Sequence, residues 1–169
     1  MVELKIGYEE MLARRKGQPP LPTAVVYPCS EDPLIGAIEA AQAGLIAPQL
    51  VGPEEQICRI AGKAQVDVSP YEFVAAADAE ESAAIAANLA GTGKAAALMK
   101  GSLHTDKYMH AALQRENGLR TDRLLSHCML IAAPAYSRPI IVSDAAVNIA
   151  PTWIRSATLF RTQSSSRKR

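Results

Sequence analysis

This sequence has few cysteines and almost no net charge. It has three cysteines, Cys29, Cys58 and Cys128, an odd number at wide spacings that suggests neither a disulfide framework nor a zinc knuckle. We therefore expect reduced thiols, as in the cytoplasm. The formal net charge is only +1, so there is no electrostatic reason to expect nucleic acid or an anionic membrane as a partner.

Long apolar runs are also absent. The nearest candidate, residues 124–135, is too short to span a bilayer. The first twenty residues carry charges throughout and lack the apolar core of a signal peptide, which also favours a cytoplasmic protein. What is present is typical of a globular chain: 169 residues, of which 49% are hydrophobic and 21% charged, suffice for one domain with its own core.

Short apolar stretches alternate with segments that favour helices. The expected strands are residues 23–27, 49–51, 71–74 and 95–99. Asp32 followed by Pro33 predicts the start of the first helix after a strand, and Gly44 its left-handed end. Gly62 is expected to end the next helix. Asp78 opens a third helix, since an acidic residue three positions later completes a capping box.

The later part of the chain continues this plan and then leaves it. A helix is expected over residues 106–116, followed by two apolar strands, residues 124–132 and 139–142, that flank a turn and form a hairpin. Strands that alternate with helices of about ten residues predict an α/β fold, a three-layer α/β/α arrangement around a mostly parallel sheet.

The loop from Lys100 to Thr105 carries the most informative chemistry. It joins a buried strand to a helix, and in an α/β sheet that position is where ligands bind. Gly101 permits close approach of the backbone, the helix N-terminus offers free N–H groups, Ser102, His104 and Thr105 add donors, and Lys100 adds charge. A phosphate or acyl phosphate would suit this loop. The alternative, of equal weight on chemistry alone, is that the hydroxyls only cap the helix and the imidazole packs.

Two further positions have a functional and a structural interpretation. Arg120 would suit a phosphate ion, although a solvated surface arginine is the more common case. Asp144 follows a buried strand and would accept from a ligand, but such residues also build turns. His104, His110 and His127 match no zinc spacing, so we expect no metal.

Read together, four segments carry a resemblance to a known family. They are TAVVYPCSEDPLIGAIEAA, KGSLHTD, GLRTDRLLSHCML and IIVSDAAVNIAPT. In this order and spacing they resemble the phosphate acetyl/butyryltransferase family, and the likeness covers about residues 20–152. It implies a phosphate acyltransferase that converts acyl-CoA and phosphate to acyl phosphate and CoA, with an acetyl or butyryl group. CoA is then a substrate, and no permanently bound cofactor is implied.

The resemblance also implies a fold and a site. The fold would be similar to that of isocitrate and isopropylmalate dehydrogenases, and the full-length family is usually dimeric. The residues expected to bind phosphate or acyl phosphate, with Lys100 included from its chemistry, are Lys100, Ser102, His104, Thr105, Arg120, Asp144 and Asn148. Family members often have arginine at the position of His110, which weakens a claim for a phosphate-binding arginine there.

The domain organisation departs from the family at the end. We expect an N-terminal helix in residues 1–19, the family-like part in residues 20–152, and a basic tail in residues 153–169 with five Arg or Lys residues and no acidic one. With suitable codons a shifted reading frame turns this tail into LDQKRDIVQNAIELAQA, which looks like a family helix, so we hypothesise a frameshift.

The matched part contains no catalytic group of the family. The serine–arginine pair and the aspartate base of the family belong to its C-terminal half and have no match here, so the catalytic residues are unknown and the activity of this chain is expected to be impaired. Two other hypotheses are a non-catalytic, acetyl-CoA-sensing regulatory module, like that of some malic enzymes, and an inert remnant.

Overall fold

The structure is a computed structural model, which describes residues 12–13, 15, 17–117, 119–120, 125–131 and 140–143. The chain divides into two compact units, Gly17–Arg120 and a second unit formed by Met1–Lys16 with Thr121–Arg169. Most of the predicted helix in residues 1–19 and the whole tail of residues 153–169 lie outside the described residues. The predicted domain boundaries therefore stay predictions.

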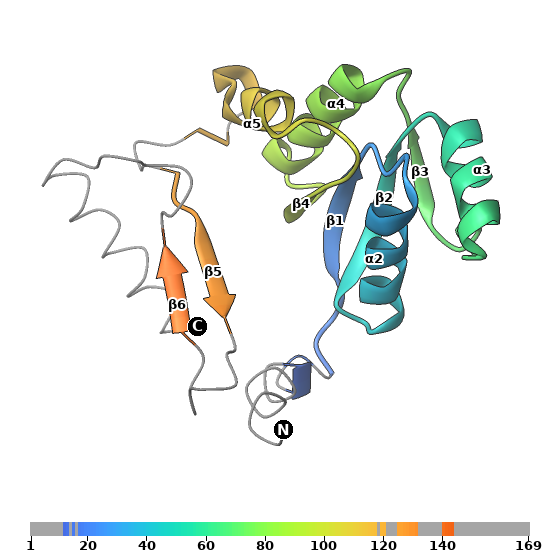
Figure 1. Ribbon diagram of the computed structural model, residues 1–169. Helices are drawn as coiled ribbons and strands as arrows, with labels where there is room; N and C mark the ends of the chain where they lie inside the picture. Colours follow the sequence, from blue (N-terminus) through green and yellow to red (C-terminus); the bar gives the residue numbers. More distant parts are fainter. Residues whose placement is uncertain are drawn as a thin grey trace, which may run out of the picture. The chain divides into compact units, whose positions relative to one another are not determined.

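The larger unit contains a parallel sheet of four strands in the order β3-β2-β1-β4 (Figure 1). The strands are β1, Leu21–Val26; β2, Ile46–Gly52; β3, Glu72–Ala75; and β4, Ala97–Lys100. All three pairings are parallel, with Val26 opposite Val51 in β2 and opposite Lys100 in β4. The predicted parallel α/β sheet is confirmed.

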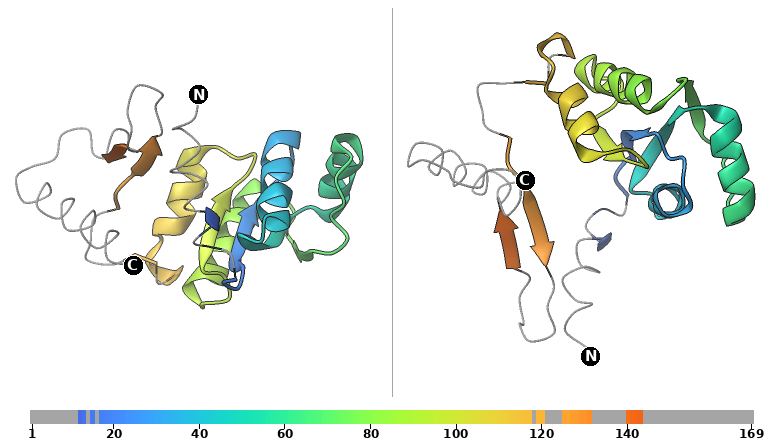
Figure 2. Two further views of the ribbon diagram at one scale, coloured as in Figure 1. Left: turned by 90° about the horizontal axis from the view of Figure 1, so that it is seen from below. Right: turned by 45° about the horizontal axis from the view of Figure 1, so that its top comes forward.

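Helices cover both faces of this sheet. The helices are α2, Glu31–Gln42; α3, Glu54–Ala64; α4, Ala79–Gly91; and α5, Thr105–Leu113, which is followed by a 3-10 helix, Arg115–Asn117. Side chains of β1 alternate between two cores: Val25 packs with residues of α2 and α3, whereas Ala24 and Val26 pack with residues of α4 and α5. The views in Figures 1 and 2 show the same grouping, so the unit is a three-layer α/β/α arrangement.

Helix α4 lies close to the sheet because small side chains face it. Ala83, Ala86 and Ala87 are buried against Ala24 and Val26 of β1. The helix begins after Asp78 as predicted, but the side chain of Glu81 accepts the N–H of Ala77 and not that of the N-cap, so the capping box is incomplete. The carboxylate of Asp78 accepts the N–H groups of Glu80 and Glu81 at 2.8 and 2.9 Å, and the carboxylate of Glu81 accepts the N–H of Ala77 at 2.6 Å.

Three helix bounds differ from the prediction. Helix α5 ends at Leu113 and not at Glu116, because Gln114 is extended and a separate 3-10 helix follows it. Helix α2 begins at Glu31 with Ser30 as its N-cap, so Asp32 and Pro33 lie in the first turn. Proline is tolerated there because the first helical N–H groups have no partner within the helix. Helix α3 continues past Gly62, and the left-handed residue that ends it is Gln65, with φ of 56°. Glycine inside a helix costs only about 0.5–1 kcal/mol relative to alanine, so Gly62 does not end α3.

The described residues of the second unit include an antiparallel hairpin of β5, Cys128–Ile131, and β6, Ile140–Ser143. This confirms the predicted hairpin, although its turn lies outside the described residues. Its large apolar side chains are exposed, among them Leu130 and Ile141, which face each other across the two strands. None of the helices in the described ranges has the length and apolar character needed to cross a bilayer.

Candidate functional site

The strand order reverses between β1 and β4, and this reversal positions the candidate site. From β1 the chain passes through α2 and α3 to β2 and β3, and it then returns through α4 on the other face to β4. The loops of residues 27–30 and 101–104 follow the carboxyl ends of β1 and β4, which are neighbouring strands. In open α/β sheets, ligands bind in the crevice at this point.

Backbone hydrogen bonds hold the two loops together. The N–H of Gly101 donates to the carbonyl of Val26 at 2.9 Å, and the N–H of Ser102 donates to the carbonyl of Tyr27 at 2.8 Å. A Cβ atom on Gly101 would lie 2.4 Å from the oxygen of Val26 and 2.5 Å from that of Tyr27. Only glycine fits at this position, because the close approach is to the chain's own β1.

Tyr27 has a strained backbone at the centre of this contact. Its φ is 53°, in the left-handed region that non-glycine residues rarely adopt. Its N–H donates to Val51 at 2.8 Å, and its carbonyl accepts the N–H groups of Cys29 and Ser102, each at 2.8 Å. Its peptide groups therefore join β2 to both loops. Strain of this kind clusters at binding and active sites, which supports a functional role for the loops.

Two serine hydroxyls meet across the loops. The Oγ atoms of Ser30 and Ser102 are 2.6 Å apart, and both residues are partly exposed. Ser102 was predicted as a site residue, but Ser30 was missed. The signal for Ser30 was its place directly before the acidic first turn of α2, where a serine is a favoured N-cap.

Two helices begin at these loops without a side-chain cap. Neither Ser30 before α2 nor His104 before α5 makes a side-chain cap hydrogen bond, in contrast to Asp78 before α4. The helix ends offer N–H groups and the positive end of a helix dipole to an anion. The exposed carboxylates of Glu31 and Asp106 in the first turns oppose this attraction, so we expect anion binding to be weak and sensitive to salt.

Lys100 stabilises the second loop. Its Nζ donates to the carbonyl of Leu103 at 2.9 Å and to that of Gly101 at 3.4 Å. This arrangement places a positive charge over the loop that carries Ser102. From α5, the hydroxyl of Tyr108 donates to the carbonyl of Leu98 in β4 at 3.1 Å, which fixes the helix that follows the loop. Partial burial raises the pKa of Tyr108, so this hydroxyl remains a donor at neutral pH.

The other predicted site residues are only partly located. His104 and Thr105 are exposed at the start of α5, beside Ser102, and Arg120 is exposed beyond the 3-10 helix. Asp144 and Asn148 lie outside the described residues. The expectation that Ser102 and Asp144 bind the same phosphate therefore stays a prediction. Within the described ranges, no group of three or more His, Cys, Asp or Glu residues is placed to hold a metal ion.

Cys29 lies in the first loop but is a poor nucleophile. Burial raises the pKa of its thiol from 9.0 to about 11, although a hydrogen bond with Tyr27 partly opposes this rise. The thiol packs against the core beneath α2 and α3. Because the thiolate is the reactive form, a covalent intermediate on Cys29 is unfavourable near neutral pH.

We expect iodoacetamide at pH 8 to alkylate the exposed Cys58 much faster than Cys29. At three pH units below its pKa, only about one Cys29 thiol in a thousand is ionised. Alkylation of Cys29 should accelerate as the pH rises towards 11. Peptide mass spectrometry over time measures the rate at each cysteine separately, and Cys58→Ser is the control that removes this exposed thiol while the exposed Cys128 remains. Equal rates at pH 8 would contradict the buried, protonated state of Cys29.

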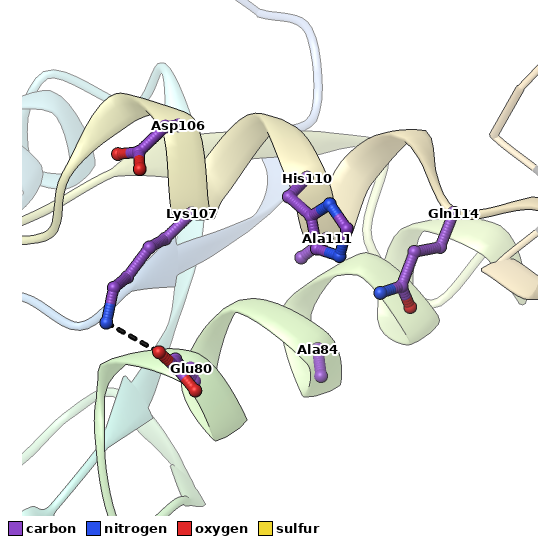
Figure 3. A pocket seen from close by; sticks show the side chains of 7 residues that line it. All are labelled: Glu80, Ala84, Asp106, Lys107, His110, Ala111 and Gln114. Atoms are coloured by element: carbon purple, nitrogen blue, oxygen red, sulfur yellow. Dashed lines mark hydrogen bonds and ion pairs between the residues drawn. The ribbon is translucent and has the colours of Figure 1, made fainter.

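A cavity of about 600 Å³ lies between α4 and α5 (Figure 3). At one end, the Nζ of Lys107 donates to the carboxylate of Glu80 at 2.5 Å, and this exposed ion pair raises the pKa of Lys107. His110 and Gln114 line the other part, and Ala84 and Ala111 also line the cavity. His110 thus lies beside α4, on a cavity that the sequence did not predict.

The chain is similar in sequence to known phosphate acyltransferases. No family model matches the chain. It is 43% identical to a phosphate acetyltransferase of Rickettsia felis over 143 residues, which are 85% of this chain and 41% of that protein. It is also 34% identical to a phosphate butyryltransferase of Clostridium beijerinckii over 148 residues, 87% of this chain and 49% of that protein.

A solved structure shares the fold. The crystal structure of a branched-chain phosphotransacylase from Enterococcus faecalis V583 matches with a TM-score of 0.65 and 18% identity, over 88% of this chain and 51% of that chain. This chain thus spans between about two fifths and one half of the length of these proteins. Over the residues that match, the chain is similar to phosphate acetyltransferases and phosphate butyryltransferases.

Proposed function

We propose that this chain supplies the phosphate-binding side of a phosphate acyltransferase active site. The reaction transfers an acetyl or butyryl group between CoA and inorganic phosphate. The thiolate of CoA attacks the carbonyl carbon of the acyl phosphate, a thioester bond forms, the bond to the phosphate oxygen breaks, and phosphate leaves. Relatives named for the acetyl and for the butyryl reaction support this class and favour it over a regulatory module.

The observation that carries the proposal is the bonded pair of loops at the reversal of strand order. Ser102 offers a hydroxyl and a backbone turn held by Tyr27, two uncapped helix N-termini begin beside it, and Lys100 adds positive charge to its loop. Tetrahedral phosphate oxygens accept hydrogen bonds from such donors. His104 and Thr105 begin α5 and would add contacts, and Arg120 is proposed to approach the same anion.

The partners follow from this reaction as further proposals. CoA would be a substrate, not a resident cofactor, and the longer family members are expected to act as homodimers. Three free cysteines in the described residues support a reducing, cytoplasmic location. Relatives are named for both the acetyl and the butyryl reaction, so a comparison of acetyl-CoA with butyryl-CoA as substrate decides between the two groups.

The test is binding of acetyl phosphate and inorganic phosphate, measured by isothermal titration calorimetry at low salt. We expect Ser102→Ala to weaken binding about tenfold, because a hydrogen bond to a charged group contributes about 1.5 kcal/mol or more. Thr92→Ala is the matched control, since its hydroxyl donates to the carbonyl of Asn88 at the end of α4, at 2.8 Å. Equal affinities of the wild-type chain and Ser102→Ala would refute the proposed site.

A further inference from the structure

The hydroxyl of Ser30 has an unusual hydrogen-bond partner for an N-cap residue. A serine at an N-cap ordinarily accepts the N–H of the second or third helical residue. Ser30 is the N-cap of α2, yet it makes no side-chain cap hydrogen bond. Its Oγ instead lies 2.6 Å from the Oγ of Ser102, which is 72 positions further along the chain. The hydrogen bond therefore joins two loops and does not stabilise the start of the helix.

Ser102 is then held by the β1 loop at two atoms. Its N–H donates to the carbonyl of Tyr27 at 2.8 Å, and its Oγ contacts the Oγ of Ser30. The preceding residue, Gly101, donates its N–H to Val26 at 2.9 Å, so the backbone on this side is fixed as well. Because both serines are partly exposed, a ligand can reach the hydroxyl pair.

The direction of this hydrogen bond depends on the ligand. Either hydroxyl can donate in the free protein. Each hydroxyl has one proton and two lone pairs, so a Ser102 that donates to a phosphate oxygen has no proton left for Ser30. In that state Ser30 must be the donor and Ser102 the acceptor. A bond accepted by Ser102 also polarises its O–H and strengthens the bond it donates to the anion.

We propose that Ser30 is a positioning residue that donates its proton to Ser102 and thereby directs the Ser102 proton at a phosphoryl oxygen. This inference rests on the proposed function. It assigns a role in phosphate recognition to the loop after β1, in addition to the loop after β4. Ser30 acts through Ser102, so its effect on phosphate binding requires the Ser102 hydroxyl.

A double-mutant cycle on the full chain tests this dependence, with inorganic phosphate as the probe in calorimetric titrations. Ser30→Ala should weaken phosphate binding about fivefold in the wild-type background, because Ser102 loses the donor that directs its proton and polarises its hydroxyl. In the Ser102→Ala background, the same change should have no further effect. Ser30→Thr keeps a hydroxyl and should bind phosphate within about twofold of wild type.

The outcomes separate the two proposals. If Ser102→Ala weakens phosphate binding but Ser30→Ala does not, the positioning role is wrong and the proposed function stands. An equal loss from Ser30→Ala in both backgrounds also overturns the role, because Ser30 would then act directly or through the general stability of the loop. If the wild-type chain binds no phosphate, the proposed function fails, and the positioning role fails with it.

Discussion

Gly101→Ala is expected to lower the melting temperature by about 10 °C or more, the largest effect on stability that we predict from the candidate site. The new Cβ would lie 2.4 Å from the oxygen of Val26, 2.5 Å from that of Tyr27 and 2.8 Å from the carbonyl carbon of Tyr27. These are backbone atoms between neighbouring strands, so they cannot yield as a flexible side chain would. Relief requires a shift of the loop, at a cost of about 2–3 kcal/mol.

Thermal unfolding followed by circular dichroism measures this effect, and Gly62→Ala is the control. Gly62 lies inside α3 with no atom near the position of a Cβ. Alanine there should leave the protein unchanged or stabilise it by about 0.5–1 kcal/mol, because glycine is unfavourable inside a helix. A Gly101→Ala variant that melts like the wild-type chain would show that the two loops are not in the close contact described.

The 169-residue chain alone is expected to transfer acyl groups at less than about one hundredth of the rate of a full-length relative. Acyl transfer needs a base for the thiol, donors for the developing oxyanion and a closed site, all in place together. The loops after β1 and β4 are proposed to supply contacts for phosphate only, and Cys29 is protonated near neutral pH. The chain spans only 41% of the phosphate acetyltransferase of Rickettsia felis.

The rate is measured as release of free thiol from acetyl-CoA or butyryl-CoA in the presence of phosphate. The Rickettsia felis enzyme at the same molar concentration is the positive control, and reactions without phosphate give the background. Turnover by this chain within tenfold of that control would mean that its 169 residues are sufficient for catalysis. The proposal that the chain supplies only the phosphate-binding side of the active site would then be wrong.

The sequence predicted the layers of the fold because each rests on local patterns. The uniformly apolar stretch of residues 23–27 predicted a strand buried on both faces of a sheet, and β1 ends one residue earlier, at Val26. The segment from Asp78 to Glu81 carries its own capping signal. The left-handed glycine at Gly44 was likewise predicted from its place after an alanine-rich helix, and its φ is 71°.

The details that depend on distant partners were not predictable in this way. The pair Asp32 and Pro33 resembles a helix start more closely than Ser30 does, and the partner of Ser30 is 72 residues away. Gly101 was expected to allow the close approach of a ligand, whereas in the structure it allows the close approach of the backbone at the end of β1. Strand order decides both contacts, because only the return of the chain to the other side of β1 brings β4 beside it.

The measurement that tests the central claim most directly is a phosphate titration of the isotope-labelled chain, followed by amide NMR. The central claim is that the loops after β1 and β4 form one phosphate site. We predict that the largest shifts occur together in residues 27–31 and 101–105, and that Ser102→Ala reduces both sets. Shifts confined to the residues that line the cavity between α4 and α5, such as Glu80 and Lys107, or no saturable shifts at all, would contradict it.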